Sequence, residues 1–152
     1  PGDYLASKFP YIAEEVTNRL QGKVTKLDED GVIGYKTIRA WQTVMGSPYT
    51  DGEISDQLLS AQEFVTSTTD AWEFNDGDGS ATIKTWQNFL VSKGYDIGSY
   101  GDDGYFGHDV AMATQKFLQD NGFSVGSYGC DGVFGYDSSM ALQKWINSQL
   151  GA

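Results

Sequence analysis

The sequence has very little of the residues on which most enzyme and metal chemistry depends. It contains one cysteine, Cys130, and one histidine, His108, among 152 residues. No internal disulfide can form, and a Cys/His zinc site needs about four such ligands. A Ser-His-Asp or Cys-His catalytic site would have to use His108. We therefore expect no metal, no cofactor and no catalysis of this kind, although a hydrolase that uses only carboxylates remains possible.

Basic residues and long apolar runs are also scarce. The chain has 10 Lys and Arg against 21 Asp and Glu, which gives a formal net charge of −11. Such a charge repels phosphate backbones and anionic lipids, so we expect neither nucleic acid nor membrane as a partner. No window approaches the roughly 18 consecutive apolar residues of a membrane span, and no signal peptide is recognisable. Because the chain begins at Pro1, we expect it to be a piece of a longer protein.

What the sequence does contain is an internal repeat. A shift of 28 residues aligns 87–116 with 115–144, and 17 of the 30 aligned pairs are identical. Both copies carry Gly-Ser-Tyr-Gly-x-Asp-Gly-x-Phe-Gly, at 98–107 and 126–135. A fainter copy begins at Asp30-Gly31, and we interpret Asp76–Ser80 as a degenerate fourth copy. A glutamine follows the Asp-Gly glycine by 11 residues in three copies: Gly31/Gln42, Gly104/Gln115 and Gly132/Gln143.

Each repeat is typical of a turn that leads into a helix. Asp-Gly favours a turn because glycine accepts positive φ and aspartate bonds its own backbone. Asp109 and Asp137 are candidate N-caps, and Gly94 and Gly122 are candidate stops after a helix. The pattern predicts helices near 80–93, 108–121 and 136–149.

The first half predicts a similar plan less clearly. Helices are expected from Pro10 to Leu20 and from Tyr35 to Val44, with a third over 53–66. The polar run 66–70 is the natural boundary. The fold class is therefore mainly α, with two small three-helix modules at 1–68 and 69–152.

These turns and helices resemble peptidoglycan-binding-like repeats. The resemblance rests on Asp-Gly-x-[Phe/Ile]-Gly before a helix that carries [Trp/Ala/Leu]-x-Gln or [Trp/Leu]-Gln, and it covers roughly 23–150. The stretch from Trp41-Gln42 through Gly46-Ser47-Pro48-Tyr49 to Ser55 is similar to the linker between repeats in phage lysins of lactobacilli, streptococci and enterococci. So is Trp72-Glu73-Phe74 before Trp86-Gln87. Residues 1–22 lie outside the resemblance.

The resemblance implies a non-catalytic cell-wall-binding domain behind a peptidoglycan hydrolase, as in a bacteriophage endolysin. Its partners would be the bacterial wall, as peptidoglycan or a neutral wall polysaccharide, and the catalytic domain of the same polypeptide. It would act at the wall, after release from the host cytoplasm or after secretion. Two alternatives stay open: a carboxylate-based wall hydrolase, and a structural or protein-interaction repeat of a virion or surface protein.

Most aromatic residues of the repeat fit a core better than a ligand site. Trp41, Trp86 and Trp145 occupy helical repeat positions, where aromatics usually pack inside. Ile33, Phe106 and Phe134 share one turn position, and we expect them to plug the space beneath each loop. We call these three the plug residues.

The candidate ligand-binding residues lie in the two glycine-rich loops: Tyr100, Asp102, Asp103, Tyr105, Tyr128 and Asp131. A tyrosine offers a flat apolar ring and a hydroxyl, and a carboxylate accepts hydrogen bonds from sugars or amides. The tyrosines could instead pack across their loops, and Asp103 and Asp131 could instead brace their turns. The acidic clusters lack the glutamate that an EF-hand calcium loop requires, so capping is the expected role.

Overall fold

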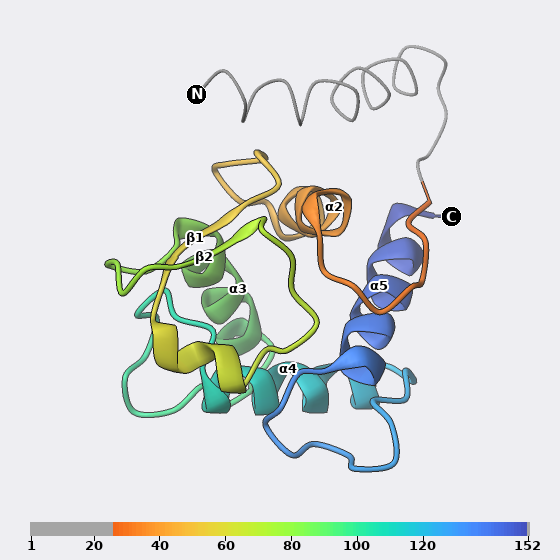
Figure 1. Ribbon diagram of the computed structural model, residues 1–152. Coiled ribbons are helices and arrows are strands. Elements are labelled where there is room, and N and C mark those ends of the chain that lie inside the picture. Colours follow the sequence, from red (N-terminus) through yellow and green to blue (C-terminus); the bar gives the residue numbers. More distant parts are fainter. Residues whose placement is uncertain (1–25, 152) are drawn as a thin grey trace.

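Four α-helices form most of the structure, a computed structural model that describes residues 26–151 (Figure 1). They are α2 (Tyr35–Met45), α3 (Ala81–Ser92), α4 (His108–Asp120) and α5 (Tyr136–Leu150). The first and last residues of each helix agree within two residues with those of a predicted helix. The mainly α fold class is therefore confirmed. The helix predicted over 10–20 lies outside the described residues. No helix within 26–151 has the length and apolar character that a membrane crossing requires.

The residues predicted to end α3 and α4 are confirmed, but those predicted to cap the N-termini of α4 and α5 are not. Gly94 and Gly122 follow α3 and α4 with φ of 91° and 89°, as predicted. The N-caps predicted at Asp109 and Asp137 are wrong, because Gly107 and Gly135 occupy those positions in extended conformation. Each aspartate lies in the first helical turn instead, where its charge still favours the helix N-terminus.

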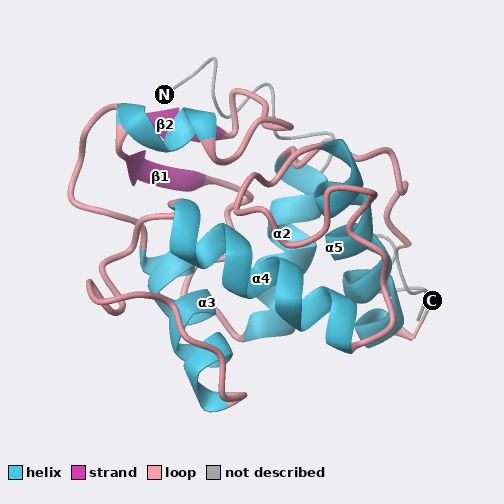
Figure 2. Ribbon diagram, turned by 90° about the horizontal axis from the view of Figure 1, so that it is seen from below, coloured by secondary structure: helices cyan, strands magenta, loops and turns pink. Residues whose placement is uncertain are grey.

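The helix predicted over 53–66 is also wrong. This stretch forms strand β1 (Ile54–Gln57) and a 3₁₀ helix, η1 (Leu59–Glu63). β1 pairs in parallel with β2 (Trp72–Phe74), with Ile54 opposite Trp72, and the two strands lie together at one side of the helices (Figure 2). Asp56 has a φ of 57°, which a continuous right-handed helix does not allow. Backbone pairing with a segment distant in sequence therefore overrides the local helical pattern.

The four helices form a closed ring. Each packs against the next along the chain, and α5 packs against α2, although these two are at opposite ends of the described chain (Figure 1). Core residues from both sides of residue 68 belong to one hydrophobic cluster. The described parts of the two predicted modules therefore share a single core.

Buried glutamines connect each helix to the loop before the next one. Gln87 of α3 accepts a 2.9 Å hydrogen bond from the Gly104 amide and donates one of 2.9 Å to Asp103. One unit later, Gln115 of α4 makes the same pair of contacts with Gly132 and Asp131. The repeated glutamine thus holds the following loop, and not the loop of its own repeat.

The same contact closes the ring between α5 and the start of the described chain. Gln143 accepts a 2.8 Å bond from the Gly31 amide and donates one of 2.9 Å to Asp30. Gly31, at a φ of 74°, lies directly against the Tyr136 ring, so that an added Cβ would be 2.4 Å from it. Gly132 lies against His108 in the same way.

The fourth Asp-Gly loop differs from the one that the sequence indicates. Gln42 of α2 accepts from the Gly52 amide at 2.9 Å and donates to Asp51 at 3.1 Å. The equivalent turn is therefore Asp51–Ile54, and the assignment of Asp76–Ser80 as the fourth copy is wrong. Residues 55–80 form an insertion between this turn and α3, whose N-cap is Ser80.

The insertion covers the plug residues, to which Ile54 is now added as the fourth. Their side chains are at most 1% exposed, which confirms the burial predicted for Ile33, Phe106 and Phe134. Each plug residue donates its backbone N–H to the insertion, and the acceptors in chain order are the carbonyls of Ser67 and Ala71, Gln57 Oε1, and the carbonyl of Phe64. The predicted core positions Trp41, Trp86 and Trp145 are likewise buried.

Candidate functional site

The two glycine-rich loops present their tyrosines to solvent. Tyr100 is 85% exposed and Tyr128 is 88% exposed. A glycine with positive φ directly follows each of them, Gly101 and Gly129 respectively. The alternative in which these rings pack across their loops is therefore contradicted, and both are accessible to a ligand.

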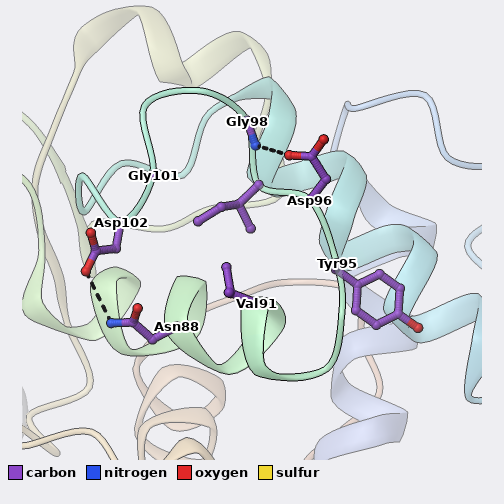
Figure 3. Close-up of a pocket in the computed structure, with 8 residues that line it drawn as sticks. Asn88, Val91, Tyr95, Asp96, Gly98, Gly101 and Asp102 are labelled. Carbon is purple, nitrogen blue, oxygen red and sulfur yellow. Dashed lines mark hydrogen bonds between the residues drawn. The ribbon is translucent and has the colours of Figure 1, made fainter.

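An open hollow of about 420 Å³ lies beside the first of these loops, and we call it the loop hollow (Figure 3). Two walls come from α3, through Asn88 and Val91, and from the segment that leaves α3, through Tyr95 and Asp96. The predicted residue Asp102 closes the other side. Tyr100 is the close neighbour of two lining glycines in sequence, Gly98 and Gly101.

The loop hollow combines carboxylate oxygens with an apolar wall. Asp96 accepts a 2.9 Å bond from the Gly98 amide through Oδ1. Asp102 accepts a 3.3 Å bond from Asn88 Nδ2 through Oδ2. The remaining oxygen of each carboxylate can accept a hydrogen bond from a ligand. Val91, 53% exposed, supplies apolar surface between them.

Two of the predicted aspartates brace their turns. Asp103 Oδ1 accepts from Gln87 and from the Tyr105 amide, at 2.9 and 3.0 Å. Asp131 Oδ1 accepts from the Val133 amide at 2.9 Å and from Gln115 at 3.1 Å. The bond from the Val133 amide, followed by that from Gln115, lowers the pKa of Asp131. One oxygen of each carboxylate is thus occupied by the fold.

Tyr105 is less accessible than the sequence indicates. Its hydroxyl donates a 2.7 Å hydrogen bond to the carbonyl of Gly77 in the insertion, and its side chain is half-buried. This contact fixes the ring against the insertion and leaves Tyr100 as the exposed tyrosine of the loop.

The second loop offers a different set of polar groups. Cys130 takes the place of Asp102, and its thiol donates to Gln119 Oε1 at 3.2 Å. Burial raises the pKa of this thiol, so it is protonated at neutral pH. Among residues 26–151, no hydrogen bond or ring contact joins Tyr128 or Asp131 to the four candidates of the first loop. The two loops therefore expose similar residues at two separate places on the protein.

Sequence reasoning missed Asn88, Val91, Tyr95 and Asp96. These residues precede the clearest repeated stretch, and the two copies differ there: Asp96 aligns with Ser124, and Val91 with Gln119. Divergence just outside an identical turn is the signal that could have identified them.

Within 26–151, no group of three or more His, Cys, Asp or Glu is placed to hold a metal ion. His108 packs over Gly132 and makes an edge contact with Phe64, which accounts for its place in the repeat. Partial burial and the nearby Glu53 raise the pKa of Glu73 on β2.

Tyr95 provides a test of the geometry at the end of α3. Its hydroxyl donates a 2.5 Å hydrogen bond to Asp120 of α4, and this bond, with burial, raises its pKa to about 12. The folded pKa exceeds the unfolded value of about 10, so the hydrogen bond contributes its full stabilisation below pH about 10. That stabilisation is lost as the pH rises through about 12. We expect an absorbance titration to show Tyr95 among the tyrosines that ionise late, and Asp120→Asn to lower its pKa toward the ordinary range. An identical titration in Asp120→Asn would contradict the hydrogen bond.

In comparisons with known proteins, no family model, curated protein or solved structure matches this chain.

Proposed function

We propose that this chain is a non-catalytic cell-wall-binding module that holds an attached peptidoglycan hydrolase, as in a phage endolysin, on a Gram-positive wall. The observation that carries the proposal is the exposure of Tyr100 beside the loop hollow, together with its counterpart Tyr128 one unit further round the ring. The motif resemblance described above supplies the class of ligand.

The loops are suited to recognition because they are rigidly held. Buried Gln87 and Gln115 fix the Asp-Gly turns at the ends of the two loops. Ordering a loop on binding costs free energy, so a loop fixed in advance binds more tightly. Two related surfaces on one rigid body also gain effective concentration on a polymer that repeats its own units.

The net charge of the chain restricts which wall component it can bind. At −11 the protein is repelled by polyanions such as teichoic acids. A neutral or amidated peptidoglycan element, or a neutral wall polysaccharide, is the ligand that this charge favours.

The principal alternative is a carboxylate-based wall hydrolase. A wall-lysis assay on the isolated chain separates the two functions, because a binding module releases no wall fragments. Sedimentation with sacculi stripped of protein tests the third function, a protein-interaction repeat. Such a repeat should stay in the supernatant.

The tyrosines give the direct test of wall binding. We expect Tyr100→Ala combined with Tyr128→Ala to weaken sedimentation with purified walls by about tenfold or more, or about 1.4 kcal/mol. Because both rings are exposed, the melting temperature should stay nearly unchanged. The matched control is Tyr49→Ala, which removes another exposed tyrosine, 60% accessible, that belongs to neither loop. Unchanged sedimentation of the double variant would place the wall site elsewhere.

A further inference from the structure

A second hollow lies at the carboxyl ends of three helices, and we call it the helix-end hollow. It has a volume of about 310 Å³ and takes its lining from α3, α4 and α5 and from the residues just beyond α3 and α4. Apart from Tyr95, its lining residues are different from those of the loop hollow. Its size suits one sugar ring and not an extended peptide.

Aromatic rings form the floor of the helix-end hollow, where Phe89 is partly exposed and Phe117 and Trp145 are 5% and 4% exposed. Phe89, Phe117 and Trp145 come from the same repeat position on three successive helices. Their ring centroids are 5.4 Å apart for Phe89 and Phe117, and 5.2 Å apart for Phe117 and Trp145. Aromatic rings of this kind supply the apolar contact that the C–H groups of a sugar or an acetyl methyl require.

Amides and an ammonium group form the rim. Asn121 donates through Nδ2 to the Phe117 carbonyl at 2.7 Å, and its Oδ1 has no hydrogen-bond partner within residues 26–151. Gln149 is exposed beside it. Lys93 holds its Nζ 5.6 Å from the centre of the Phe89 ring. No carboxylate lines this hollow, in contrast to the loop hollow with its two aspartates.

The two hollows meet at Tyr95, which lines both of them. Figure 3 shows the Tyr95 ring directed away from the loop hollow, and its hydroxyl is bound to Asp120 of α4. One fixed side chain therefore separates the hollows. A linear polymer that crosses the end of α3 can place neighbouring units in each.

We infer that the helix-end hollow is a binding site for one N-acetylated sugar ring of a wall glycan, and that this ring is adjacent to the unit held at the loop hollow. The inference rests on the proposed wall-binding function for its choice of polymer. The exposed part of the floor, chiefly Phe89, contacts the acetyl methyl and C–H groups of the sugar. Asn121 and Gln149 bond the acetamido group and hydroxyls. Lys93 donates to a ring oxygen or hydroxyl at the rim.

The experiment uses the full chain and a tetramer of N-acetylglucosamine as the probe, followed by two-dimensional nitrogen–proton NMR. We expect the Trp145 indole and the side-chain amides of Asn121 and Gln149 to shift on titration. Cellotetraose, which has the same linkage without acetamido groups, should leave them in place. Lys93→Ala with Gln149→Ala should weaken tetramer binding by about tenfold, or about 1.4 kcal/mol. Lys144→Ala, on the exposed part of α5, is the matched control.

Three outcomes would overturn the site: no shift at saturating tetramer, equal shifts with cellotetraose, or binding that the double variant leaves unchanged. Failure of the wall-binding proposal is distinguishable, since it is measured by sedimentation with walls. Binding of the tetramer at Trp145 without sedimentation would support the sugar site and contradict the proposed function. Sedimentation that depends on Tyr100 and Tyr128, without binding of the tetramer, would support the proposed function and contradict this site.

Discussion

Phe134→Ala should lower the free energy of unfolding by about 3–5 kcal/mol, the usual cost of truncating a fully buried phenylalanine. The side chain is completely inaccessible and lies edge-on to Phe106, with ring centroids 5.4 Å apart. No neighbour can fill the space easily, because the insertion is fixed above it by the Phe134–Phe64 and Thr66–Phe134 backbone bonds. The loss would approach the total stability of many small domains, about 5–15 kcal/mol. Urea denaturation followed by tryptophan fluorescence measures it.

The neighbouring residue gives the control for this variant. Val133 precedes Phe134 in the same loop and is 39% exposed, so Val133→Ala should change stability much less. A loss below about 1 kcal/mol for Phe134→Ala would contradict its assignment as a plug residue.

Gln143→Leu should destabilise the protein by about 3 kcal/mol, because it removes the contact that closes the ring. The leucine keeps most of the side-chain volume but leaves the Gly31 amide without its acceptor. The Val32 carbonyl and Asp30 lose their donor at the same time. A buried donor left unpaired costs about 1–3 kcal/mol on its own, and here several groups lose a partner together. Urea denaturation again provides the measurement.

A comparison of two glutamines tests whether the ring is closed in solution. Gln115 makes the equivalent contacts 17 residues along the chain, whereas Gln143 reaches Gly31 across 112 residues. If the ring is closed, Gln115→Leu and Gln143→Leu should have similar effects. A near-neutral Gln143→Leu beside a costly Gln115→Leu would show that the first loop is not docked on α5. Gln149→Leu, in an exposed position of the same helix, should be nearly neutral.

The candidate site was partly accessible to sequence reasoning. The exposure of Tyr100 and Tyr128 follows from their place between glycines, where no large side chain can cover them. Asn88 and Tyr95 belong to the loop hollow only because the chain folds back from the end of α3 along that helix. The helix-end hollow was not visible at all, since its floor consists of residues that periodicity assigns to the core.

The sequence by itself determined the local structure of this protein. Periodic apolar residues place the four helices, and a glycine with positive φ follows each of them. Each of the four equivalent Asp-Gly turns is followed by one buried plug residue. These features depend on neighbours within a few residues, so a single chain segment specifies them. The 28-residue repeat also shows that successive helices are built alike.

Only the tertiary structure decided how these units join. Gln143 is chemically equivalent to Gln115, but nothing local indicates that its partner is Gly31 at the other end of the described chain. Residues 53–66 have a helical pattern, yet they become a strand and a 3₁₀ helix because the plug residues have backbone N–H groups that need acceptors. A buried N–H must be paired, and the insertion supplies that pairing. Long-range hydrogen bonds of this kind leave no periodic trace in the sequence, and they fix both the closed ring and the position of the two hollows.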